Sequence, residues 1–125
     1  MKRLLAILLF IPILGFSQYT AIPDQNFEQA LIGLGHDDVI DGQVLTANIS
    51  SLTSLHVSYK NISDLTGIED FTVLTELECG NNQLTNLDVS NNTALTSLIC
   101  DYNQLTILDV SGCTALTYLP CYNNQ

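Results

Sequence analysis

Basic residues are scarce in this sequence, and their scarcity limits the partners that it can have. Among its 125 residues, 13 are acidic and 3 are lysine or arginine, for a formal net charge of −10. Lys2 and Arg3 begin the chain, so residues 18–125 carry Lys60 alone against 13 acidic residues, a net charge of −12. Such a surface repels nucleic-acid phosphates and anionic membranes. We therefore expect no nucleic-acid partner. Solubility explains the charge, with cationic partners or divalent ions as the alternative.

The sequence also contains only one long apolar run. Residues 4–14 are almost wholly apolar, follow two basic residues and precede the small-residue stretch at 15–17. This pattern predicts a secretory leader over residues 1–17, with cleavage before Gln18. The run is shorter than the ~20 residues that cross a bilayer, so an uncleaved anchor is the less favoured alternative. We expect a secreted or cell-surface protein with no transmembrane segment after leader removal.

From residue 52 onward the chain repeats itself with a period of 21 or 22 residues. The units are 52–73, 74–94, 95–115 and an incomplete 116–125. Each follows the pattern L-x-x-L-x-(C/V)-x-x-N-x-(L/I), except that the first carries Lys60 in place of asparagine. One unit cannot bury its own leucines, but strands stacked ~4.8 Å apart can, with Leu77 between Leu55 and Leu98. The second half of each unit repeats this rhythm, which predicts two apolar walls.

This pattern resembles the leucine-rich-repeat family, in which each unit contributes one short strand to a curved parallel sheet. The wider chain is similar to the secreted leucine-rich-repeat proteins of Bacteroidetes and Flavobacteria. Their internalin-like first unit resembles residues 61–72, and their N-terminal segment resembles residues 22–35. The resemblance implies a leucine-rich-repeat solenoid, with short parallel β-strands stacked in a curved right-handed coil and an N-terminal α-helical cap. It is specific for the fold and says little about function.

The fourth unit is incomplete where the sequence stops at Gln125. Because a solenoid needs a cap at each end, we expect this chain to be the N-terminal fragment of a longer protein. The similar proteins often carry a C-terminal sorting domain for type IX secretion, and residues 1–125 contain nothing that resembles one.

Residues 18–51 are expected to cap the first coil. Asp24 suits the N-cap of a helix, and Gly35 suits the left-handed residue that ends one, so we predict a helix over about residues 24–34. Its apolar face follows the i, i+3, i+4, i+7 spacing of a helix and comprises Phe27, Ala30, Leu31 and Leu34. The segment Val44–Ile49 is expected to add a first irregular strand.

Asparagine recurs at the corner that follows each strand. Asn82, Asn103 and Asn124 keep the 21-residue spacing of the leucines. An asparagine turned inward there hydrogen-bonds the backbone of its own coil and its neighbour, and buried polar groups need such partners. We therefore predict a structural asparagine ladder. Asn92 occupies the opposite corner, and Cys113 replaces it one repeat later.

Three of the four cysteines, Cys79, Cys100 and Cys121, also recur every 21 residues. They occupy the third core position of successive strands, where the first unit has Val57, and cysteine there behaves as a small buried apolar residue. We favour buried thiols. A disulfide between neighbours, which a secreted setting permits, and a metal site are the alternatives, although no C-x-x-C pair is present. Cys113 lies on the opposite wall.

No residue pattern predicts catalysis, a cofactor or a metal site. His56 alternates with the core positions, so its side chain points away from the cysteines, and His36 lies in the loop after the helix. Neither histidine meets a serine and an acid as a catalytic triad requires. Asp37, Asp38 and Asp41 lack the spacing and closing glutamate of a calcium loop, so we favour a solvated acidic turn. We therefore do not expect an enzyme.

Positions between the core leucines point outward and vary from unit to unit, which is how a solenoid builds a specific surface. Tyrosine is enriched in interface hot spots, so the tyrosines of this face are candidate anchors. The candidate binding residues are His56, Tyr59, Glu76, Glu78, Asn81, Ile99, Asp101, Tyr102, Tyr118 and Tyr122. We predict a secreted or cell-surface module that binds a protein or a glycan through this face. The alternatives are a passive spacer, or an accessory domain of a larger secreted protein or enzyme.

The repeat predicts that Leu98 is a buried member of the leucine column. Replacing it removes buried apolar surface and leaves a cavity, so Leu98→Ala should lower the free energy of unfolding by about 2–5 kcal/mol. A urea titration measures this change. A loss below about 1 kcal/mol contradicts the register.

Overall fold

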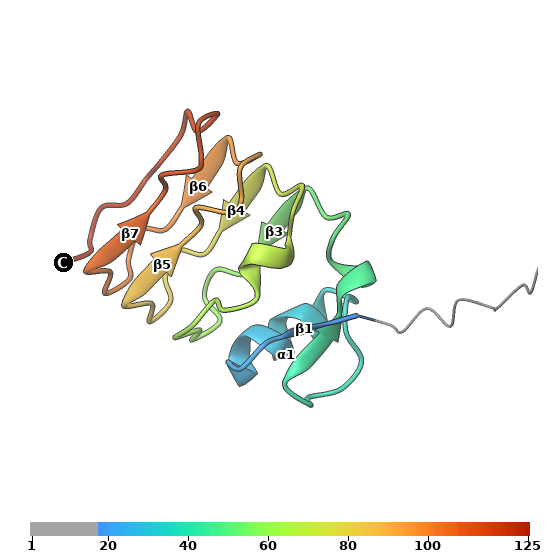
Figure 1. The fold of residues 1–125 in the computed structure, drawn as a ribbon. Coiled ribbons are helices and arrows are strands. Elements are labelled where there is room, and N and C mark those ends of the chain that lie inside the picture. The colour runs from blue at the N-terminus through green and yellow to red at the C-terminus, as the bar shows by residue number, and fades with distance from the viewer. Residues whose placement is uncertain (1–17) are drawn as a thin grey trace, which may run out of the picture.

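The computed structural model describes residues 18–125, so the predicted leader, residues 1–17, lies outside the described residues. The elements in chain order are β1 Tyr19–Ala21, α1 Gln25–Gly33, β2 Gln43–Leu45, the 3-10 turn η1 Thr46–Asn48, β3 Ser54–His56, the 3-10 turn η2 Ile68–Asp70, β4 Glu76–Glu78, β5 Asn86–Asp88, β6 Ser97–Ile99 and β7 Ile107–Asp109. They form an open stack of coils, with α1, β1 and β2 at one end and the C-terminus at the other (Figure 1).

One wall of the stack is a parallel sheet of three short strands in the order β3–β4–β6. Leu55, Leu77 and Leu98 lie in direct register, and each is almost fully buried. A bridge between Ser97 and Tyr118 continues the pairing into the last coil. This is the register that the repeat predicts. It is strongly specified, because a slip by one residue would turn each leucine outward.

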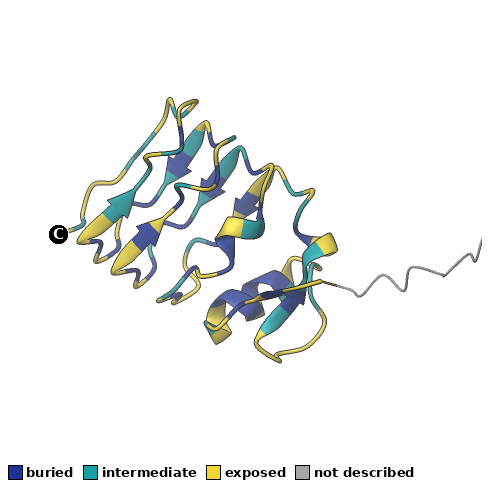
Figure 2. Ribbon diagram, viewed as in Figure 1, coloured by how far each residue is buried: buried dark blue, intermediate teal, exposed yellow. Residues whose placement is uncertain are grey.

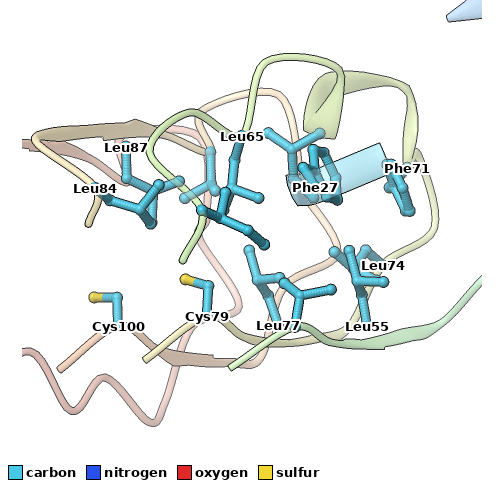
Figure 3. Close-up of a cluster of buried hydrophobic side chains, with 14 of the residues drawn as sticks. Phe27, Leu55, Leu65, Phe71, Leu74, Leu77, Cys79, Leu84, Leu87 and Cys100 are labelled. Carbon is cyan, nitrogen blue, oxygen red and sulfur yellow. The ribbon is translucent and has the colours of Figure 1, made fainter. Parts of the chain in front are cut away.

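The second wall is the parallel pair β5–β7, in which Leu87 lies opposite Leu108. In β3, β4, β5 and β6 the central residue is buried and its two neighbours are more accessible, as Figure 2 shows. The side chains between the walls form one apolar cluster that includes leucines and cysteines and reaches Phe27 and Phe71 (Figure 3). Each coil supplies only a few of these side chains, so the core is continuous only because the coils stack.

Two cysteines lie in this core, as the repeat predicts. Cys79 and Cys100 are fully buried and point into the interior side by side from neighbouring coils (Figure 3). Cys121, which we expected to join them in the core, is exposed. It belongs to the last coil of the described residues. Cys113 is buried at the opposite wall, and all four cysteines are free thiols.

The asparagine at each corner joins its own coil to the preceding one. Asn82 Oδ1 accepts the backbone N–H groups of Lys60 and Ile62, both at 3.0 Å. Its Nδ2 donates to the carbonyl oxygens of Val57 at 2.9 Å and Cys79 at 3.0 Å. The equivalent bonds in the next two coils are made by Asn103 and Asn124. These side chains therefore complete backbone hydrogen bonds that the turn leaves open.

The opposite corner uses two different side chains for the same contact. Asn92 Nδ2 donates to the carbonyl oxygens of Ile68 at 2.8 Å and Phe71 at 3.2 Å. One repeat later, the Sγ of Cys113 lies 3.1 Å from the carbonyl oxygen of Val89 and 3.5 Å from that of Asn92. A thiol is a weaker donor than an amide, so the exchange keeps the contact but weakens its hydrogen bonds.

The helix α1 is bounded by caps on both sides. Asp24 is its N-cap, and its Oδ1 accepts the backbone N–H groups of Asn26 and Phe27 at 2.9 Å. At the other end Gly35 adopts a φ of 84°. Leu34, which we expected on the apolar face, is 46% exposed, because it lies at the C-cap, beyond the last helical turn. None of the helices in residues 18–125 has both the length and the apolar character needed to cross a membrane.

Strand β2 differs from the prediction for Val44–Ile49. Of the predicted segment, only Val44 and Leu45 are in a strand, and the 3-10 turn η1 follows them. Strand β2 pairs antiparallel with β1 instead of joining the parallel sheet. The buried carboxylate of Glu28 explains the turn before β2, because its Oε1 accepts the backbone N–H groups of Asp41, Gly42 and Gln43 at 2.9 to 3.2 Å. A side chain of α1 thus directs the chain back toward β1.

The N-terminal segment is fastened to the first coil by polar and apolar contacts. Asp24 Oδ2 accepts the backbone N–H groups of Ser63 at 2.8 Å and Asp64 at 3.0 Å. The rings of Phe27 and Phe71 stack with their centroids 6.2 Å apart. Gly67 has a φ of 106°, and a Cβ there would overlap the side chain of Ile22, so only glycine fits this junction.

Removing one asparagine from a corner should destabilise the stack. Asn103→Ala leaves the buried N–H of Leu84 without its acceptor, and a buried unsatisfied group costs about 1–3 kcal/mol. The matched control is Gln104→Ala at the exposed neighbouring position, which should change the free energy of unfolding by less than about 0.5 kcal/mol. Both values come from urea titrations. Equal effects of the two substitutions would argue against a structural role for Asn103.

The buried thiols should be unreactive in the folded protein. Desolvation raises the pKa of Cys100 to about 12 and that of Cys79 well above its ordinary value, and only a thiolate attacks a disulfide reagent. We expect Cys121 to react first with Ellman's reagent at about pH 8, and the other thiols only in denaturant. Cys121→Ser should abolish the fast reaction. Rapid reaction of two or more thiols in the native protein would contradict this burial.

Candidate functional site

The candidate binding residues lie on the outward side of the β3–β4–β6 sheet and on the turns that follow its strands. We call this surface the strand face, and it comprises His56, Tyr59, Glu76, Glu78, Asn81, Ile99, Asp101, Tyr102, Tyr118 and Tyr122. The histidine and the four tyrosines are exposed, whereas Glu76, Glu78, Asn81 and Ile99 are half-buried. The arrangement follows from strand alternation, since the neighbours of each buried leucine point to the opposite side.

Four tyrosines give this face its apolar surface. Tyr59 is the most accessible, with 76% of its surface exposed. The others are Tyr102, Tyr118 and Tyr122, each more than half exposed. The rings of Tyr102 and Tyr122 meet edge to face, with centroids 5.8 Å apart and planes at 82°. This geometry is the favourable one for an aromatic pair, so the two rings hold each other in place.

Two of these tyrosines adopt a backbone conformation that L-residues avoid. Tyr59 and Tyr102 have φ values of 59° and 54°. The equivalent positions of the other coils hold Asn81 and Asn123, at 55° and 54°. The turn is fixed by stacking, because the N–H of the left-handed residue donates to the next coil, as Tyr59 does to the carbonyl oxygen of Gly80 at 3.3 Å. Asparagine adopts this conformation readily, whereas other residues do so at a cost of about 1–2 kcal/mol.

Asp101 is buried, with 7% of its surface exposed, although the sequence pattern predicted an exposed side chain. The preceding coil has Gly80 at the equivalent position, and Asp101 Oδ1 lies 3.1 Å from the place that a Cβ of Gly80 would take. The carboxylate fills the space that the glycine leaves. Its negative charge is the main reason that the pKa of Tyr122 is raised, with desolvation, Tyr102 and Tyr118 as smaller causes.

Tyr102, Tyr118 and Tyr122 form a local group that we call the tyrosine cluster. Their phenols are close enough to raise the pKa of Tyr122 together with Asp101. They come from the third and fourth coils, so the cluster exists only because those coils stack. Tyr59 lies two coils away, which corresponds to roughly 10 Å at the ordinary strand spacing.

Three ionisable side chains of the strand face also converge. His56 Nε2 lies 3.9 Å from Oε1 of Glu76 and 3.9 Å from Oε1 of Glu78. Sequence reasoning missed this group, because it considered each histidine against serines and acids for catalysis and expected no metal site. The signal was present in the register, since Glu78 follows His56 by 22 residues, one repeat along the chain.

The acidic turn at residues 37–41 is not such a group. Asp37, Asp38 and Asp41 are absent from the one set of three or more metal-ligating side chains that converges within residues 18–125. Burial is the main reason that the pKa of Asp37 is raised, and the charges of Glu28 and the neighbouring aspartates add to it. The carboxylate of Glu28 accepts the backbone N–H groups of Asp41 and Gly42 in this turn.

A shallow groove lies away from the strand face, between the first coil and β5. It has a volume of about 490 Å³ and is lined by polar and acidic residues, including Asp64, Glu69, Asn86 and Asp88. Histidine, cysteine and serine are absent from this lining.

Comparison with known proteins identifies relatives among the internalins of Listeria monocytogenes. No family model matches the sequence. Internalin J of Listeria monocytogenes is 44% identical over 70 residues, which is 56% of this chain and 8% of that protein. The solved functional domain of the same internalin, described as including a cysteine ladder, superposes with a TM-score of 0.75 at 39% identity, over 87% of this chain and 25% of that one.

Two further structures are similar to this chain. Internalin F of Listeria monocytogenes superposes with a TM-score of 0.70 at 26% identity, over 83% of this chain and 31% of that one. A structure of the CBM51-2 and INT domains of Clostridium perfringens ZmpB has a TM-score of 0.59 at 24% identity, over 71% of this chain and 19% of that one. This likeness shows a shared fold alone. The chain spans a third or less of each of these relatives. It forms a leucine-rich-repeat solenoid that is similar to part of the internalins.

Proposed function

We propose that this chain is a non-catalytic binding module that recognises a partner through the strand face. The observation that carries the proposal is the position of Tyr59 and Tyr102. Both occupy left-handed turn positions where the other coils have asparagine, and asparagine would satisfy the turn at lower cost. A side chain that is exposed and costs the fold stability suggests a role outside the fold. Binding a partner is such a role.

The chemistry of the strand face favours a protein partner with lysine or arginine side chains. Exposed tyrosine rings attract cations over their faces, and carboxylates accept charge-assisted hydrogen bonds from them. Glu76 and Glu78 lie on the same face as the tyrosines, and residues 18–125 carry a net charge of −12. A glycan that stacks its rings on the tyrosines is the alternative. The negative charge adds nothing to the binding of a neutral glycan, so the protein partner is favoured.

The location that we propose is the cell surface or the extracellular space. The predicted leader at residues 1–17 supports it, and so does the similarity to internalins, which are surface or secreted proteins. From the sequence resemblance we also propose that the protein comes from a Bacteroidetes-type bacterium and is exported by type IX secretion. A passive spacer, or an accessory domain of a larger secreted protein, is the competing role, and it predicts that no partner recognises the tyrosines.

We also propose that residues 18–51 serve as the N-terminal cap and that the cysteine column is structural. Asp24, Phe27 and Glu28 fasten this segment to the first coil or fix its turns, which supports the first part. Cys79 and Cys100 are fully buried in the core, which supports the second. A cysteine ladder is described for the similar domain of Internalin J, and the periodic thiols here fit the same description.

The double substitution Tyr59→Asn, Tyr102→Asn separates binding from folding. We expect it to weaken binding to a Lys/Arg-rich peptide library at least about tenfold, as loss of two hot-spot tyrosines would. Asparagine relieves left-handed strain of about 1–2 kcal/mol at each position. The loss of the Tyr102–Tyr122 ring pair costs about 0.5–1.5 kcal/mol, so the free energy of unfolding should not fall. Binding is measured on immobilised peptides and on a glycan array, and stability by urea titration.

The matched control is Tyr19→Asn, which removes an exposed tyrosine from β1, outside the strand face. It should leave binding unchanged. Loss of glycan binding without loss of peptide binding would identify a glycan as the ligand. Undiminished binding by the double variant would refute recognition through these tyrosines. Absence of binding by the unsubstituted chain would favour the spacer role.

A further inference from the structure

The cluster of His56, Glu76 and Glu78 is built by two neighbouring strands of the main sheet. His56 ends β3, and Glu76 and Glu78 begin and end β4. The parallel register sets His56 directly beside Glu78 and Ser54 beside Glu76. The two glutamates flank the buried Leu77, so both side chains leave the same side of the strand. Their backbone positions are therefore fixed by the sheet and not by a loop.

The distances bring one ligand atom of each side chain to a common point. His56 Nε2 is 3.9 Å from Oε1 of each glutamate, and the three atoms all lie within 4.8 Å of one another. In a tetrahedral site with bonds of ~2.0–2.2 Å, ligand atoms are roughly 3.4 Å apart. The exposed fractions of the side chains are 55%, 44% and 33%, so they can rotate the remaining distance.

The charge of this cluster is not balanced by the protein. Two carboxylates share one side of β4, and the ion pairs found within residues 18–125 are the two with His56. A histidine carries a charge only when it is protonated. Residues 18–125 contain one lysine, Lys60, and no arginine. Two like charges held together repel each other, and a bound cation would remove that repulsion.

We propose that His56, Glu76 and Glu78 bind a divalent transition-metal ion of the zinc class on the strand face. One imidazole nitrogen with two carboxylate oxygens suits zinc and its neighbours, whereas calcium and magnesium take oxygen ligands. Three protein ligands leave a coordination position open to water or to a group of a bound partner. The site lies among the candidate binding residues, but its metal affinity does not depend on the proposed partner.

The test is an isothermal titration calorimetry experiment in which Zn²⁺ alone is added to the purified chain. We expect one site of micromolar affinity, weakened at least about tenfold by His56→Asn and by Glu78→Gln, because each removes a ligand. The matched control His36→Asn changes the other histidine, in the loop after α1, and should leave the affinity unchanged. Circular dichroism checks that every variant folds, as expected for substitutions at accessible side chains.

The exposed thiol of Cys121 is the competing zinc ligand, so Cys121→Ser is included. Unchanged affinity in this variant, with loss in His56→Asn, supports the proposal. Absence of Zn²⁺ binding in the unsubstituted chain overturns it. So does binding that His56→Asn and Glu78→Gln leave intact, or binding that is lost only with Cys121. Because no peptide or glycan is present, failure here leaves the proposed partner binding separately testable.

Discussion

The stacking of one coil on the next is the interaction on which the rest of this structure depends. No coil encloses a core of its own: Leu77 is buried because Leu55 and Leu98 lie on either side of it. The backbone follows the same rule, since the N–H of Thr96 donates to the carbonyl oxygen of Thr75 in the preceding coil. Apolar burial and hydrogen bonding thus require the same neighbour, and a change in register would lose both.

The corners show how a repeated fold tolerates variation. An inward asparagine completes the backbone hydrogen bonds of two coils at one corner, while the opposite corner accepts either Asn92 or Cys113. The left-handed turn is held by hydrogen bonds between coils, so it persists with tyrosine or asparagine at that position. Because the frame is fixed by its neighbours, a side chain that costs stability can be kept where a surface needs it.

Stacking also builds the outward surface. Residues about one repeat apart become neighbours, so Tyr102 meets Tyr122 and His56 meets Glu78. The arrangement of side chains on the strand face therefore depends on how neighbouring coils are stacked. The N-terminal segment joins this frame differently, through individual contacts such as those of Asp24 with the backbone at residues 63 and 64. Such contacts do not recur along the sequence, so the repeat pattern does not predict them.

The sequence by itself determined the features that are local or periodic. The leucine register, the buried column of Cys79 and Cys100 and the N-cap Asp24 follow from spacing and residue type alone. The tertiary structure decided the burial of Asp101, which depends on the empty space beside Gly80, and the antiparallel pairing of β2, which depends on Glu28. It also decided the exposure of Leu34 and Cys121 and the meeting of His56 with two glutamates. The physical reason is common to all of these: each depends on which atoms a neighbouring segment supplies, and spacing along the chain does not contain that information.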